Sequence, residues 1–86
     1  MQINDQEQYD RFIDTIKLNL IVWKRSAKKD YSEIAQKLET SDRTARRRFK
    51  YPDTMTLGEL FAVCELYGKD PAEVLRQAAN ESRKHE

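Results

Sequence analysis

Four cationic side chains near the middle of the chain have the types and the spacing to bind a polyanion. On a helix over residues 41–50, the positions i, i+3, i+4 and i+7 of one face are Arg43, Arg46, Arg47 and Lys50. Like charges at these spacings repel by about 0.2 to 0.5 kcal/mol per pair. Phosphates would neutralise them and release condensed counterions, and guanidinium groups also match guanine O6 and N7. The spacing therefore favours a nucleic-acid-binding face over a merely solvated one.

The charge is concentrated in the same part of the chain. Residues 24–50 carry ten basic and four acidic side chains, a net charge of +6, whereas residues 1–23 carry −2 and residues 51–86 carry −3. The total of +1 hides this division. One cationic face raises the local concentration of a polyanion, and the acidic remainder limits indiscriminate binding.

Other chemistries find little support. The 86 residues form one domain, and they contain one cysteine, Cys64, and one histidine, His85, so we expect no disulfide and no zinc site. A phosphate-binding glycine loop and a Ser/His/Asp arrangement are both missing, and we expect no catalysis and no cofactor. We expect Cys64 to be a buried small hydrophobe. The chain has no apolar run of about 18 residues and begins without a signal peptide, which predicts a cytoplasmic protein with no membrane partner.

Apolar spacing and capping residues predict five helices and no strand. The helices are expected over about residues 5–27, 31–38, 42–50, 57–67 and from residue 71, with the tail 80–86 frayed. Their starts are marked by the capping residues Asn4, Asp30, Ser41, Thr56 and Asp70. We therefore expect an all-α, compact five-helix domain.

The apolar residues divide into predicted inward faces and a few that fall outside them. The first helix should bury Tyr9, Phe12, Ile13, Ile16, Leu20 and Trp23, and the fourth should turn inward Leu57, Leu60, Phe61, Cys64 and Tyr67. Ala45 and Phe49 should be the inward residues of the third helix. Leu18, Ile21 and Val22 lie off the first stripe, so other helices or a second copy of the protein should cover them.

Over roughly residues 20–78 this arrangement resembles the helix-turn-helix DNA-binding domains of phage repressors and Cro-like regulators, the lambda-repressor-like family. The resemblance is carried by Asp30, Tyr31, Ile34-Ala35, Leu38, Ser41 and Ala45, and by the later segments 56–60 and 66–75. Three positions depart from the family pattern. Glu39 replaces the usual glycine of the turn, while Thr40 and Arg48 replace apolar residues. Phe49 is expected to supply the apolar packing that Arg48 does not.

The resemblance implies a sequence-specific regulator of transcription, a repressor for example, with the helix-turn-helix at about 31–50 and residues 42–50 in the major groove of double-stranded DNA. It places Asp42, Arg43, Arg46 and Arg47 at base edges. Phosphate contacts are expected from Tyr31, Ser41, Thr44, Lys50, Tyr51, Lys28 and Lys29. Asp42 could equally be present because a carboxylate at a helix N-terminus is stabilised by the helix dipole. The same dipole stabilises cations at a helix C-terminus, so for Lys24, Arg25, Lys28 and Lys29, at the end of the first helix, this interpretation and phosphate binding are equally favoured.

We expect a homodimer, because one recognition module buries only about 600 to 1,000 Å² of protein surface. The contact surface would be the extra apolar flank of the first helix or the fifth helix, with recognition helices about 34 Å apart. An alternative function is a helical protein-interaction module, antitoxin-like or a phage accessory protein, that binds an acidic protein surface. RNA binding is a third interpretation, less favoured because no aromatic platform accompanies the basic face.

Overall fold

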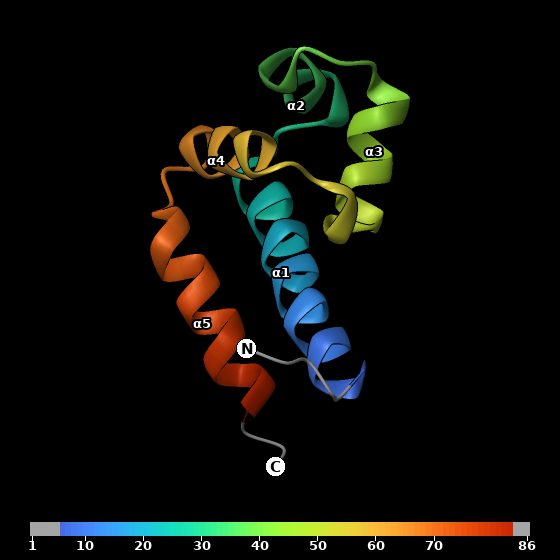
Figure 1. The fold of residues 1–86 in the computed structure, drawn as a ribbon. Coiled ribbons are helices and arrows are strands. Elements are labelled where there is room, and N and C mark those ends of the chain that lie inside the picture. Colours follow the sequence, from blue (N-terminus) through green and yellow to red (C-terminus); the bar gives the residue numbers. More distant parts are fainter. Residues whose placement is uncertain (1–5, 84–86) are drawn as a thin grey trace.

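The computed structural model describes residues 6–83, and within this range it contains five α-helices, one short 3₁₀-helix and no strand (Figure 1). The elements are α1 (Gln6–Ala27), α2 (Tyr31–Leu38), α3 (Asp42–Lys50), η1 (Pro52–Thr54), α4 (Leu57–Leu66) and α5 (Pro71–Arg83). The all-α, five-helix prediction is confirmed. Only η1, between α3 and α4, was not expected from the sequence.

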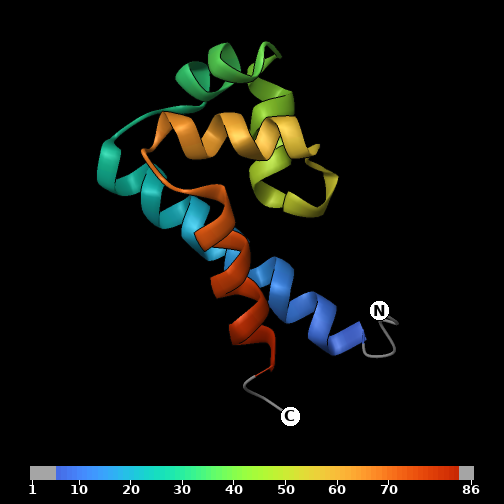
Figure 2. The ribbon, with the colours of Figure 1, turned by 60° about the vertical axis from the view of Figure 1, so that its left-hand side comes forward.

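The helices form two groups along the long helix α1. Helix α5 packs along α1 and runs in the opposite direction, while α2, α3 and α4 gather at the other end, around the C-terminal half of α1 (Figures 1 and 2). The guanidinium Nε of Arg11 donates a hydrogen bond of 3.0 Å to the carbonyl of Ser82, which ties the far ends of α1 and α5 together. Helix α3 packs on α2, also contacts α1, and makes no contact with α5.

One core joins all five helices. Each helix contributes a residue whose side chain is fully inaccessible to solvent: Leu20, Ile34, Ala45, Val63 and Ala78. Ile16, Ala35 and Phe49 belong to the same cluster. Because each helix buries apolar surface against the others, the position of α3 depends on the whole core and not on local propensity alone.

The predicted caps are present where the structure describes them. Asp30 accepts a hydrogen bond from the Glu33 N–H at 3.1 Å, and Asp70 accepts one from the Ala72 N–H at 3.0 Å. Thr56 and Glu59 form a reciprocal capping box with bonds of 2.9 and 3.0 Å. Each cap satisfies a backbone donor that the helix leaves free and contributes about 1 kcal/mol. The expected cap Asn4 lies outside the described residues.

Two expectations about burial and order are wrong. Leu57 and Phe61 are 80% and 58% exposed, because α4 buries the side that carries Leu60, Val63 and Cys64, and at 3.6 residues per turn the other two lie about 70° and 110° from the middle of that side. The tail was expected to fray over residues 80–86, of which 84–86 lie outside the described residues, yet α5 continues to Arg83. Ser82 is buried there and its hydroxyl donates to the Ala79 carbonyl at 2.7 Å, which holds the last turn in place.

Outside the core, α1 presents Leu18 and Val22 to solvent, with exposed fractions of 63% and 56%. No other helix among residues 6–83 covers this pair. Of the two covers expected from the sequence, other helices or a second copy of the protein, the other helices are therefore excluded. Trp23, in contrast, is half-buried and packs against the core, with its ring centroid 5.9 Å from that of Tyr67. Cys64 is fully buried, and burial first, then the charge of Asp70, raises the pKa of its thiol.

The hydroxyl of Tyr67 leads to a stability prediction. This buried oxygen has no hydrogen-bond partner among the described residues, and burial, with smaller contributions from Glu33 and Tyr31, raises the pKa of Tyr67 to about 12. Removing an unsatisfied buried hydroxyl relieves a desolvation cost of about 1 kcal/mol. We expect Tyr67→Phe to leave the free energy of unfolding in urea unchanged or to raise it by about that amount.

The same variant has a pH signature. Above a pH of about 10 the unfolded tyrosine ionises while the folded one stays neutral until about pH 12, so wild-type stability falls with pH across this window. In Tyr67→Phe, the fall in folding stability between about pH 10 and pH 12 should be smaller than in the wild type. Tyr51→Phe, at an exposed position, should show the same fall as the wild type. A loss of more than about 1 kcal/mol in Tyr67→Phe at neutral pH would show that the hydroxyl has a partner in solution.

Candidate nucleic-acid interface

A tight turn places α3 on α2. Glu39 adopts the left-handed conformation, with φ 57° and ψ 47°, and the Thr40 N–H donates to the Ala35 carbonyl at 2.9 Å. This conformation costs a residue other than glycine about 1 kcal/mol, a cost small enough for Glu39 to stand where the resemblance predicts glycine. Ser41 then accepts a hydrogen bond from the Thr44 N–H at 3.1 Å and starts α3. The predicted cap and the three-residue link are both present.

One face of α3 is buried and the other is cationic. Ala45 is fully buried and Phe49 is 2% exposed, and the Phe49 ring meets Tyr31 edge to face at 5.8 Å and 83°. The residues that face solvent include all four predicted cations: Arg43, Arg46, Arg47 and Lys50. These four residues are hereafter the cationic face. Their grouping on one exposed side of a helix is confirmed.

The cationic face has no neutralising carboxylate within residues 6–83. The ion pairs in this range involve other cations, for example Lys29 with Glu33 and Lys37 with Glu65. Two members lie over aromatic rings: the Arg46 guanidinium is 4.4 Å from the Tyr31 centroid, and the Lys50 ammonium is 5.4 Å from that of Tyr51. Such contacts orient a cation and leave its charge in place. The face is thus a concentration of positive charge without internal compensation.

The fourth arginine of the segment, Arg48, behaves differently from the other three. Arg48 Nε lies 3.2 Å from Glu59 Oε1, and the two side chains are only 25% and 19% exposed. Glu59 at the same time accepts the Thr56 N–H in the capping box. Arg48, which stands where an apolar residue was expected, therefore forms a half-buried ion pair that links α3 to the start of α4. Phe49 fills the apolar position beside it. The packing role of Phe49 was expected, whereas the ion pair could not be read from the spacing, because Glu59 is eleven residues away.

The other predicted residues lie around this face in different states. Asp42 is exposed in the first turn of α3, and the Ser41 hydroxyl donates to the Thr44 hydroxyl at 3.0 Å as part of the cap. Tyr51 is 48% exposed, directly after α3. Lys28 is exposed in a left-handed conformation (φ 56°), and Lys29 has an exposed partner in Glu33 at 3.7 Å.

Tyr31 brings one cation of the basic cluster at the end of α1, Lys24, to the interface. It is half-buried at the start of α2, and both Arg46 and Lys24 lie over its ring, the Lys24 ammonium at 4.6 Å from the centroid. Lys24 comes from the last turns of α1. In sequence it is one of several cations before the turn, and nothing in their spacing distinguishes it from Arg25 or Lys28.

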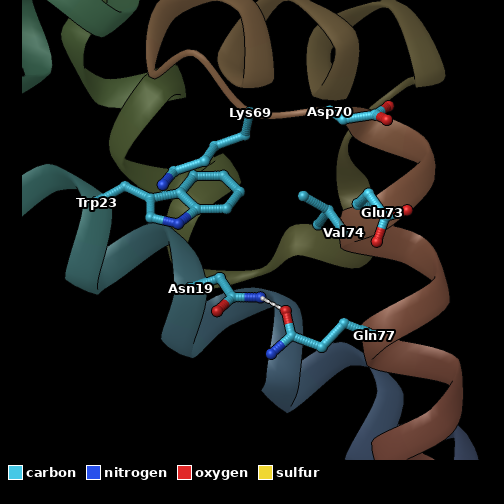
Figure 3. Close-up of a pocket in the computed structure, with 7 residues that line it drawn as sticks. All are labelled: Asn19, Trp23, Lys69, Asp70, Glu73, Val74 and Gln77. Atoms are coloured by element: carbon cyan, nitrogen blue, oxygen red, sulfur yellow. Dashed lines mark hydrogen bonds between the residues drawn. The ribbon is translucent and has the colours of Figure 1, made fainter.

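A pocket of about 340 Å³ lies between α1, α5 and the link before α5, and no residue of α3 lines it (Figure 3). The side chains that line it are Asn19, Trp23, Lys69, Asp70, Glu73, Val74 and Gln77. Lys69 lies over the Trp23 ring at 5.8 Å, and the Asn19 amide donates to Gln77 at 3.5 Å across the floor (Figure 3). The cation and the two carboxylates give the pocket a mixed charge, unlike α3.

Metal sites and membrane spans find no support in the part of the chain that is described. Residues 6–83 hold no group of three or more His, Cys, Asp or Glu side chains placed to ligate a metal ion. In the same range, no helix has both the length and the apolar character needed to cross a membrane.

Comparisons of the chain with protein-family models, with curated proteins and with solved structures give no match. What the interface can do is therefore inferred from its geometry. A short helix with a capped start, a buried inner face and four exposed, unpaired cations can present positive charge and guanidinium donors to a polyanion as one rigid unit.

Proposed function

We propose that this protein is a sequence-specific regulator of transcription that binds double-stranded DNA through a lambda-repressor-like helix-turn-helix, with α3 in the major groove. The single observation that carries the proposal is the uncompensated cationic face on a helix whose other side is anchored in the core. A major groove about 12 Å wide accepts an α-helix, and duplex phosphates supply the negative charge that the chain itself does not provide.

The roles of the side chains follow from their partners. Arg43 and Arg47 contact neither a carboxylate nor an aromatic ring among residues 6–83, so their guanidinium groups are available for bidentate bonds to guanine. Asp42 and Arg46 lie next to them and are assigned to base edges as well. Phosphate contacts are assigned to residues around the helix: Tyr31, Ser41, Thr44, Lys50, Tyr51, Lys28 and Lys29. The exposed Lys29–Glu33 pair, at 3.7 Å, is weak enough to exchange for a phosphate.

The proposed homodimer has two candidate surfaces. Exposed apolar pairs one helical turn apart occur on α1, at Leu18 and Val22, and on α4, at Leu57 and Phe61. Helix α5 offers no such exposed pair, since Val74 and Ala78 are buried. Of the two helices considered from the sequence, α1 is therefore favoured, and α4 is added to it.

Analytical ultracentrifugation tests the dimer. We expect the wild type to sediment at about twice the chain mass of 10.2 kDa, and one of the double variants Leu18→Ser/Val22→Ser and Leu57→Ser/Phe61→Ser to sediment as a monomer. Surface substitutions of this kind change folding stability by no more than about 0.5 kcal/mol, so the other double variant is the matched control. A wild type that stays monomeric at all concentrations contradicts the dimer.

The function is tested by fluorescence anisotropy against four labelled ligands: a random DNA duplex, the DNA upstream of the protein's own gene, an RNA hairpin and polyglutamate. We expect binding to both duplexes at low salt, tighter binding to the upstream DNA, and a steep loss of affinity as salt rises. Tightest binding to polyglutamate would favour the protein-interaction alternative, and tightest binding to the hairpin would favour RNA. No binding to either duplex at low salt would overturn the proposal.

A further inference from the structure

Two cations from different helices share one aromatic ring at the edge of the cationic face. The Lys24 ammonium, on α1, and the Arg46 guanidinium, on α3, lie 4.6 and 4.4 Å from the ring centroid of Tyr31, the first residue of α2. No carboxylate pairs with either cation within the described range. Three separate helices thus bring two uncompensated positive charges to one aromatic ring.

The ring explains how the charges stay together. Each cation is attracted to the electron-rich ring, while the two repel each other, so an anion that reaches both would relieve this repulsion. Tyr31 is itself held by its edge-to-face contact with Phe49, a residue of the core. The platform is therefore fixed before any ligand arrives, and the two long side chains lose less freedom on binding.

We propose that Lys24 and Arg46 together bind one phosphate of the DNA backbone, and that Tyr31 is a positioning residue that holds them through its ring. This inference rests on the proposed function and extends the interface from α3 to the end of α1. It assigns a phosphate contact to Lys24 and moves Arg46 from the base edges to the backbone. It also gives the aromatic face of Tyr31, rather than its hydroxyl, the role in binding.

Lys24→Gln tests the phosphate contact. A phosphate contact contributes about 0.9 to the slope of log affinity against log salt. We therefore expect Lys24→Gln to weaken binding to random and upstream duplexes alike, and to lower the slope by about one. Equivalently, the ratio of wild-type to variant affinity shrinks about 3.5-fold between 50 and 200 mM salt. Lys17→Gln removes the same charge from the same helix two turns away and should leave the slope unchanged.

Two substitutions of Tyr31 separate the ring from the hydroxyl. Tyr31→Phe keeps the ring and should bind within about twofold of wild type, whereas Tyr31→Leu should weaken binding about as much as Lys24→Gln. Because both act on one contact, the double variant Lys24→Gln/Tyr31→Leu should lose less affinity than the product of the two single losses. Circular dichroism of each variant confirms that it is folded before its binding is compared.

The outcomes separate this inference from the function on which it rests. If the wild type binds duplexes with a steep salt dependence but Lys24→Gln behaves like Lys17→Gln, the shared phosphate site is wrong and the proposed function stands. If Tyr31→Phe is as damaging as Tyr31→Leu, the hydroxyl makes the contact and the ring platform is wrong. A wild type that binds no duplex overturns both.

Discussion

Arg47→Ala should weaken binding to the preferred DNA sequence by about 1 to 3 kcal/mol, on the order of 5- to 150-fold, with the loss concentrated at one base position. Arg47 is exposed in the middle of the cationic face and has no partner among residues 6–83, so its guanidinium is free to bond to a base. The loss against random duplex should be smaller, because only the charge is removed there. Anisotropy titrations with single-base variants of the preferred duplex measure both effects.

Arg48→Gln is the matched control for Arg47→Ala. It removes the same charge from the next residue of the same helix, but Arg48 is turned toward Glu59 and lies off the cationic face. We expect its discrimination between bases to equal that of wild type, although the folded state no longer has the ion pair. Equal losses for both variants on every sequence would mean that α3 binds DNA through charge alone.

The largest effect on stability is expected for Phe49→Ala. Phe49 is 2% exposed in the main core cluster and seats the C-terminal half of α3. Removing a buried phenylalanine side chain costs about 3 to 5 kcal/mol, a large share of the roughly 5 to 15 kcal/mol that stabilises a domain. Urea unfolding can be followed through Trp23, the only tryptophan of the chain.

Phe61→Ala provides the comparison, since Phe61 is 58% exposed. Its cost should stay below about 1 kcal/mol. Unfolding at two protein concentrations distinguishes a weakened dimer, which depends on concentration, from weakened core packing, which does not. A cost for Phe49→Ala no larger than that for Phe61→Ala would contradict the seating of α3 on the core.

The parts of the fold that the sequence predicted are those with local causes. Helices over 31–38 and 42–50 begin and end where expected, because Asp30 and Ser41 each satisfy a backbone donor three residues ahead. The cationic face likewise follows from a 3.6-residue period and an inward Phe49. Signals of this kind act within one or two turns of a helix, so a short stretch of sequence contains them completely.

The features that were missed depend on neighbours brought close only by the fold. Arg48 finds Glu59 on α4, and Lys24 meets Arg46 on the ring of Tyr31. Leu57 matched the inner face of α4 by its spacing, but the direction of that face is set by where α2 and α5 pack. Periodicity identifies an apolar stripe, while the neighbouring helices decide which edge of the stripe is covered.

The most direct test of the central claim is a map of amide chemical shifts in two-dimensional ¹H–¹⁵N NMR spectra as a DNA duplex is added. If α3 enters the groove, the largest shifts will fall at residues 41–51, with smaller ones at residues 24–31, and they will diminish as salt is raised. Spectra that do not change at low salt, or shifts confined to α5 and the first half of α1, would contradict DNA binding by the cationic face.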